Sequence, residues 1–154
     1  MKRTYLIFLV LAIGMLILGI VFAGAVLGLY FNVPAFIIVV FLPAFMVIGV
    51  YGLQTFLRSF RLAFDGTEAT SEQHVTGAAL FSMLGRSLLL TGFITTMIGL
   101  IAMLGELREK SELGRTVALA LITLFYSLIL MLLVSVPFKF AHEKRLAEMS
   151  KEEK

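Results

Sequence analysis

The side chains best suited to chemistry in this sequence are hydroxyls that recur at helical spacing in two uncharged stretches. Within each stretch, small and hydroxyl residues stand three or four positions apart, so they share one face of a helix. The first set comprises Ser87, Thr91, Gly92, Thr95, Thr96 and Gly99, and the second comprises Thr116, Ala120, Thr123 and Ser127. Such hydroxyls either bond to helix carbonyls and hold two helices together, or they line a polar pathway.

The elements that must position these residues are membrane helices. The chain has 154 residues, of which 60% are hydrophobic and 15% charged. A soluble domain of this length could not bury so much apolar surface. Residues 5–57, 87–105 and 116–138 contain no Asp, Glu, Lys or Arg. Since about 20 apolar residues cross a bilayer, we expect an all-α membrane protein with four spans in a single membrane domain covering 1–154. The spans are predicted at about 4–31, 34–57, 84–105 and 115–138.

Local signals mark where these helices begin. The N-terminus resembles a secretory signal with a cleavage site after Ala25, but its apolar run is long, so we interpret it as a retained first helix. Pro34 suits the first turn of the second helix, and Pro43 is expected to bend that helix. The sequence from Thr70 to Gln73 is typical of a capping box, which places the start of the third helix near Ser71.

Orientation follows from the distribution of Lys and Arg. Two basic residues precede the first span, three lie between Arg58 and Arg86, and five follow the last span. The connector between the third and fourth spans has three, balanced by three glutamates, and the connector between the first and second has none. Both termini, the loop 58–83 and the tail 139–154 are therefore predicted to be cytoplasmic, with the tail as a charged helical extension.

The sequence argues against an enzyme and against a metal or cofactor site. There is no cysteine, and the two histidines, His74 and His142, both have polar neighbours typical of loops, so no metal centre and no cofactor are expected. No paired carboxylates or nucleophile–base arrangement occurs within the predicted spans. Because ion carriers normally hold a charged group in the membrane, any titratable group would have to come from another polypeptide.

The second half of the chain resembles the MotA/TolQ/ExbB family of proton-channel subunits. The stretch from Gly92 to Leu100 is similar to the family's Gly-Leu-Leu-Gly-Thr-Val-x-Gly-Met, and 118–137 is similar to its last helix. Asn32-Val33-Pro34-Ala35 and Ile38-Val39 resemble the MotA-type turn and the start of its second helix. The matching residues of the two helices are Gly92, Thr96, Gly99, Ala118, Ala120, Leu121, Thr123, Tyr126, Val134 and Pro137.

This resemblance implies a multi-pass protein of the bacterial inner membrane, driven by an ion-motive force. It implies a homo-oligomeric ring, typically a pentamer, around a single-span MotB/TolR/ExbD-like partner that carries the membrane Asp. The implied ion pathway and partner-facing positions are Thr96 and Thr123, supported by Thr91, Thr95 and Ser127, with Gly92, Gly99 and Tyr126 nearby. The implied structural positions are Pro34, Pro43 and Pro137.

The sequence also departs from the family pattern, and the departures favour a second interpretation. Leu89 replaces a usual proline, Leu124 replaces the second threonine of a Thr-Thr pair, and Phe41-Leu42 replaces a double glycine. The large cytoplasmic domain is reduced to the Arg58–Arg86 segment. A non-conducting four-span scaffold is therefore the alternative, and a transporter half with its site near Pro34 and Pro43 is a third reading, against which the missing charges argue.

Overall fold

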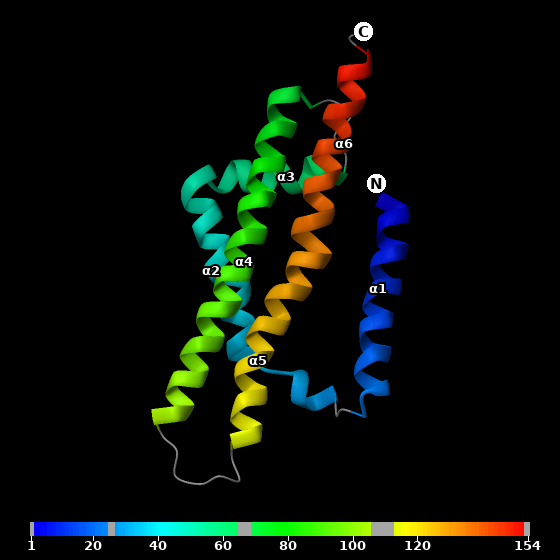
Figure 1. Cartoon of the computed structure of the whole chain (residues 1–154). Helices are drawn as coiled ribbons and strands as arrows, with labels where there is room; N and C mark the ends of the chain where they lie inside the picture. Colours follow the sequence, from blue (N-terminus) through cyan, green and yellow to red (C-terminus); the bar gives the residue numbers. More distant parts are fainter. Residues whose placement is uncertain (1, 25–26, 65–68, 106–112, 153–154) are drawn as a thin grey trace.

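The computed structural model describes residues 2–24, 27–64, 69–105 and 113–152, and every regular element within them is helical. In chain order these are α1 (Lys2–Phe22), η1 (Leu27–Tyr30), α2 (Val33–Tyr51), α3 (Leu53–Phe64), α4 (Ser71–Gly105), α5 (Leu113–Leu130), η3 (Met131–Ser135) and α6 (Val136–Glu152). Figure 1 shows α2, α4 and the rod formed by α5, η3 and α6 side by side, with α3 running across them. The two chain ends lie toward the end of the bundle that carries α3.

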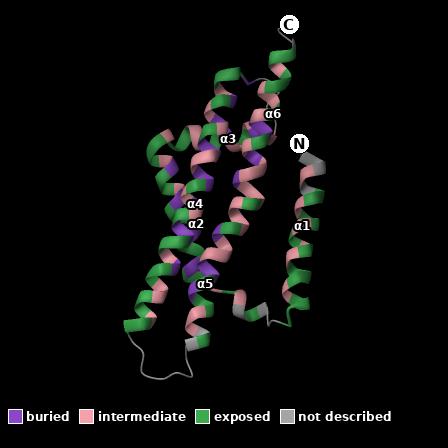
Figure 2. Cartoon of the chain, viewed as in Figure 1, coloured by how far each residue is buried: buried purple, intermediate pink, exposed green. Residues whose placement is uncertain are grey.

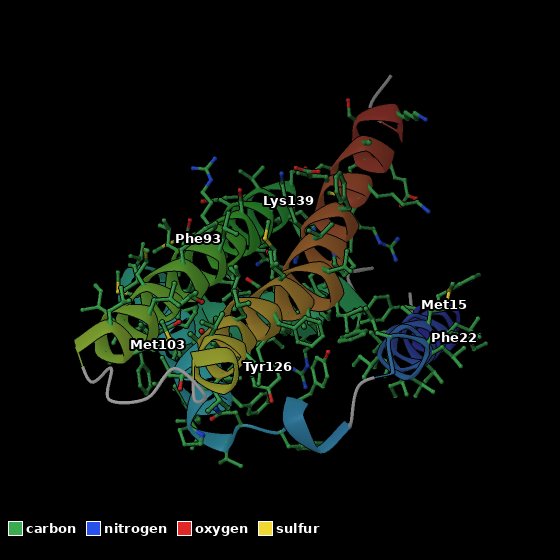
Figure 3. The ribbon with its side chains drawn as sticks, turned by 60° about the horizontal axis from the view of Figure 1, so that its bottom comes forward. Met15, Phe22, Phe93, Met103, Tyr126 and Lys139 are labelled. Atoms are coloured by element: carbon green, nitrogen blue, oxygen red, sulfur yellow. The ribbon has the colours of Figure 1, made fainter. Side chains whose placement is uncertain are left out.

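The first helix stands to one side of the others. Met15 and Phe22 on α1 lie at a distance from the helices that carry Phe93, Tyr126 and Lys139 (Figure 3). The helix ends at Phe22, short of the predicted position 31, and the chain turns at Gly24, whose φ of 69° is a conformation that glycine adopts without steric cost. The described chain resumes as the 3₁₀ helix η1, while 25–26, which include the alternative cleavage position Ala25, lie outside the described residues.

The second helix begins where the sequence predicts and ends earlier. The Asn32 side chain accepts a hydrogen bond from the Ala35 amide at 3.1 Å, and Pro34 occupies the first turn. The helix continues through Pro43, and the bend expected there stays a prediction. It ends at Tyr51 and not at Leu57, because Gly52 takes a φ of 80° and redirects the chain into α3.

The short helix α3 is amphipathic. Ser59 and Ala63 are buried against the bundle, whereas Leu57, Arg58 and Arg61 are exposed. What sequence reasoning treated as the last turns of a span is thus a separate helix that lies across the bundle (Figure 1).

The third long helix starts with the predicted capping box. The Thr70 hydroxyl accepts from the Gln73 amide, and the Gln73 side chain accepts from the Thr70 amide, each at 3.4 Å. From Ser71 the helix runs unbroken to Gly105, the last described residue before 106–112, so the predicted start near Ser71 is confirmed and the predicted end of the span stays a prediction.

The last helix of the sequence prediction is a rod longer than one span. It begins at Leu113, passes through a π-helical turn at Met131–Ser135, and reaches Glu152, which confirms the helical tail. Pro137 explains the turn: a proline has no N–H to give to the carbonyl four residues earlier, which belongs to Leu133. The Tyr5 hydroxyl of α1 donates to that free carbonyl instead.

The core is concentrated where α3 crosses the long helices. Phe60, Phe81 and Phe138 meet there with ring centroids 4.9–5.2 Å apart, and Tyr5 contacts Phe138 from α1. Buried residues also follow the facing sides of α4 and the rod (Figure 2). These contacts fix α3, α4 and α6 to one another.

The outer surfaces of the helices are suited to lipid. Within the described residues, three helices are long and apolar enough to cross a membrane, Val33–Tyr51, Ser71–Gly105 and Thr116–Lys151, and Ile7–Phe22 is a shorter apolar one. Only 22%, 22% and 17% of the most apolar windows of the three are buried within the chain. A soluble protein would not expose such surfaces, so the protein is a membrane protein with three long apolar helices and a shorter fourth.

Candidate functional site

The hydroxyl-bearing faces of α4 and the rod meet along one line of close contact, which we call the seam. At each step a glycine of α4 faces a small or polar residue of the rod. The pairs are Gly99 with Ala120, Gly92 with Ser127, Gly85 with Ser135, and Gly77 with His142. A Cβ atom added to these glycines would lie 3.0, 2.0, 2.5 and 2.4 Å from the partner side chain, so the helices approach closely only because side chains are missing here.

The two threonines expected to line an ion pathway lie together within the seam. The Thr96 and Thr123 hydroxyl oxygens are 3.0 Å apart, and each also lies within hydrogen-bond distance of the Ala120 carbonyl, at 3.0 and 2.8 Å. Both residues are buried, at 6% and 9% exposure. In this arrangement their hydroxyls join α4 to α5.

The remaining predicted hydroxyls of the pathway bond within their own helices or pack in the interior. Thr95 donates to the Thr91 carbonyl at 2.6 Å, and Ser127 donates to the Leu124 carbonyl at 2.8 Å. Thr91 is buried, and Gly92 is buried against Ser127. The structure therefore brings Gly92, Thr96, Gly99, Thr123 and Ser127 together along the seam and leaves Thr95 half-exposed beside it.

Tyr126 differs from the other predicted partner-facing positions because it turns toward the connection before α2. Its hydroxyl donates to the Tyr30 carbonyl and accepts from the Asn32 amide at 3.0 Å, and its ring contacts Phe36. Within this chain the side chain fixes the start of α2 to α5 (Figure 3).

Sequence reasoning missed part of the seam and the burial of the histidines. Ser135 donates to the Phe81 carbonyl at 2.7 Å, and its partner Gly85 could have been found because the glycines from Gly77 to Gly99 recur every seven or eight residues. The polar neighbours of His74 and His142 are typical of loops, but both residues lie on helices, as the predicted start near Ser71 and the predicted helical tail require, and both are buried. Their contact could not be found from the sequence, because they are 68 positions apart.

No cofactor or metal arrangement emerges from these positions. Among the residues that the structure describes, no group of three or more His, Asp or Glu side chains is placed to hold a metal ion. The seam thus offers hydroxyls, carbonyls and close helix contact, and its titratable side chains are the histidines at one end.

Comparison with known proteins decides the family. Residues 56–153 match the MotA/TolQ/ExbB proton channel family. The chain belongs to this family. The matched region contains most of α3, the whole of α4, α5 and η3, and α6, so all four glycine pairs of the seam lie within it.

Two curated relatives agree with this membership. Over 73 residues the chain is 40% identical to Motility protein A of Borreliella burgdorferi, and over 68 residues it is 35% identical to Chemotaxis protein PomA of Vibrio alginolyticus. These matches cover 47% and 44% of this chain but only 28% and 27% of the relatives. The resemblance inferred from the seam residues is confirmed at the level of the family.

Proposed function

We propose that the chain is a subunit of an ion-motive-force-driven complex in the bacterial inner membrane. It crosses the membrane four times, through α1, α2, α4 and the rod, with both termini, α3 and the tail on the cytoplasmic side. In this proposal the chain conducts ions and catalyses no chemical reaction. Support comes from its family, from the placement of both chain ends toward one end of the bundle, and from the concentration of basic residues near that end.

The observation that carries the proposal is the combination of a proton-channel family with spans that hold no charged side chain. The apolar stretches 5–57, 87–105 and 116–138 have no Asp, Glu, Lys or Arg. A carrier of protons or sodium ions through hydrocarbon needs a group that binds the ion. The chain therefore acts with a single-span MotB/TolR/ExbD-like partner whose membrane aspartate supplies this group.

A ring of identical subunits accounts for the exposed helix faces. On α4 the large apolar side chains Phe93, Ile94, Met97 and Ile101 are each more than half exposed. In a homo-oligomer, which we propose to be a pentamer, one flank of each subunit covers its neighbour, another faces lipid, and the inner flank of α4 and α5 faces the partner helix.

The threonine pair is proposed to act on this inner flank. Thr96 and Thr123 hold α4 and α5 at a fixed distance, and the partner helix packs against the surface that they form together. The threonine oxygens retain lone pairs that an ion or a protonated carboxyl could contact. Thr91, Thr95 and Ser127 support the same wall, and Gly92 and Gly99 keep it thin.

Copurification followed by flux measurement tests the proposal. The chain is expressed with its genomic neighbours, the bound single-span protein is identified, and subunit numbers are counted by native mass spectrometry. Reconstituted together, the two proteins are expected to give ion flux that disappears when the partner's membrane Asp is replaced by Asn. Thr96→Val should reduce the flux severalfold, whereas Thr76→Val, on α4 before the apolar stretch, should not. A chain that purifies only as a monomer without a partner contradicts the proposal.

A non-conducting scaffold is the second candidate, and one observation favours it. The hydroxyls of Thr95, Thr96, Thr123 and Ser127 already have hydrogen-bond acceptors inside the chain, and Leu124 stands where the family pattern has another threonine. Two results together would decide for the scaffold: a ring that assembles with its partner but gives no ion flux, and cells carrying Thr96→Val that behave like the wild type.

A further inference from the structure

Beyond the seam's threonines, the two histidines of the chain form a buried contact between α4 and α6, which we call the histidine pair. The Nδ1 atoms of His74 and His142 are 2.9 Å apart, and the residues are only 1% and 0% exposed. The ring of Phe81 stacks on His142, and a Cβ on Gly77 would lie 2.4 Å from the His142 ring. The rings therefore occupy a space that the surrounding helices leave only for them.

The hydrogen bonds determine where the protons of the pair lie. His142 Nε2 is 3.1 Å from the Ser59 carbonyl of α3, and a carbonyl can only accept, so this nitrogen carries a hydrogen. In a neutral ring the other nitrogen, Nδ1, is then an acceptor, and His74 Nδ1–H must donate to it. His74 Nε2 is consequently left with a bare lone pair, and it is buried without a hydrogen-bond partner among the described residues.

This arrangement fits two neutral rings. It does not fit a protonated form of either ring. A proton added to His142 Nδ1 would place two N–H groups against each other across 2.9 Å. A proton added to His74 Nε2 would leave a charged N–H buried with no acceptor, which is costlier than a buried neutral group. Either event destabilises the contact that the histidines make between α3, α4 and α6 next to the aromatic core.

No described charged group stands ready to compensate such a proton. Arg58 and Arg61 on α3 and Glu72 on α4 are exposed. On α6, Glu143 forms a salt bridge with Lys139 at 3.5 Å, and Arg145 forms one with Glu148 at 3.5 Å. The side chains of both pairs are partly exposed. Burial accordingly lowers the pKa of His142 below its ordinary value, the Ser59 carbonyl opposes this, and His74 adds to the lowering.

We propose that the histidine pair is a proton-binding site that couples pH to the docking of α6: neutral, it holds α6 against α3 and α4, and on taking up a proton it releases the part of α6 that follows Phe138. The pair lies near the end of the bundle that carries α3 and the C-terminal tail. Under the proposed topology, on which only this placement rests, the pH that it senses is that of the cytoplasm. Acidification of the cytoplasm therefore changes the position of α6, the last part of the rod.

Histidine-selective NMR tests the proton assignment, because the chain has just two histidines. The untagged protein in micelles is titrated from pH 8 to 4.5 while the ring nitrogens are observed. We expect Nδ1–H on His74 and Nε2–H on His142 at pH 8, and a pKa of His142 below its ordinary value of 6.5. A His142 pKa at or above 6.5, or the opposite tautomers, would overturn the proposal.

Distance measurement tests the release of α6. Since the chain has no cysteine, spin labels can be placed at the exposed positions Val75→Cys on α4 and Lys144→Cys on α6. One narrow distance is expected at pH 8, and a longer, broader distribution at pH 5. His142→Gln, which keeps an amide donor and cannot titrate, should abolish this change, whereas Glu143→Gln, at a half-exposed carboxyl, should retain it.

Gly77→Ala disturbs the pair without replacing either histidine. Its methyl group would occupy the position of the His142 ring, so the longer distance is expected already at pH 8. A wild-type distance that does not change between pH 8 and 5, or a pH response that survives in His142→Gln, would refute the proposal. These measurements use the purified chain and no ion flux, so they can fail while the proposed transport function stands.

Discussion

Replacing Gly92 with alanine tests whether α4 and α5 approach as closely as the seam requires. The new Cβ would lie 2.0 Å from Ser127 Oγ, 2.8 Å from Ser127 Cβ and 3.2 Å from Leu124 Cδ1. The Leu124 methyl and the serine hydroxyl can rotate away, but Ser127 Cβ is fixed to its backbone. To reach an ordinary contact of 3.4 Å from 2.8 Å, the helices must separate by the difference, 0.6 Å, at this turn.

Such a separation has a cost that exceeds the gain from a better helix former. Overpacking of a close contact costs about 1–3 kcal/mol, and the Thr96–Thr123 contact one turn away, now 3.0 Å, would lengthen as well. Exchanging glycine for alanine in a helix returns only about 0.5–1 kcal/mol. We therefore expect Gly92→Ala to lower the free energy of unfolding by about 1–2 kcal/mol.

The assay is unfolding by SDS in mixed micelles, followed by circular dichroism. Gly49→Ala in α2 is the matched control, because its Cβ would meet nothing within 4 Å, so it should raise the free energy of unfolding by about 0.4–1 kcal/mol. Adding Ser127→Gly to Gly92→Ala should recover most of the loss. The reasoning is refuted if Gly92→Ala stabilises the protein as much as Gly49→Ala does.

Three further predictions follow from the hydrogen bonds and the histidine pair. Thr96→Val removes a hydroxyl from the seam while Thr123 stays bonded to its own helix, so the free energy of unfolding should fall by about 0.6–1.7 kcal/mol in the same assay; a loss above about 3 kcal/mol would contradict this role. Tyr126→Phe keeps the ring but removes the bond to the Asn32 amide, so the amides at 31–36 should exchange hydrogen faster, and unchanged protection would count against it. Burial lowers the pKa of His142 in the folded state, so on acidification the unfolded chain binds more protons than the folded one. The free energy of unfolding should therefore be constant above pH 6.5 and decrease as the pH falls below it. A free energy of unfolding that rises on acidification would be incompatible with a buried neutral pair.

Much of the fold was open to prediction because it depends on local chemistry. The Asn32–Pro34 start of α2 and the Thr70–Gln73 capping box are satisfied by hydrogen bonds between neighbours, so their residue types suffice. The end of α2 was predicted less well. Leu53 to Leu57 are as uncharged as the helix before them, and nothing in that composition reveals that Gly52 adopts a positive φ.

The candidate site was predicted by residue but not by contact. Helical spacing placed Thr96 and Thr123 on the small, hydroxyl-bearing faces of their helices, and the structure brings their oxygens together. The family resemblance grouped Tyr126 with them, yet its hydroxyl bonds to the connection before α2, because a long side chain at the edge of a face can reach another element.

By itself the sequence determined that this is a membrane protein, where its long helices start, and that its spans carry hydroxyls without a charge, since each of these depends on composition and on neighbours in the chain. Only the tertiary structure decided which groups complete one another across long separations. The carbonyl of Leu133, left free by Pro137, is taken by Tyr5, and His74 meets His142 between α4 and α6. The physical reason is that a buried polar group must find its partner in space, and the position of that partner follows from how the helices pack.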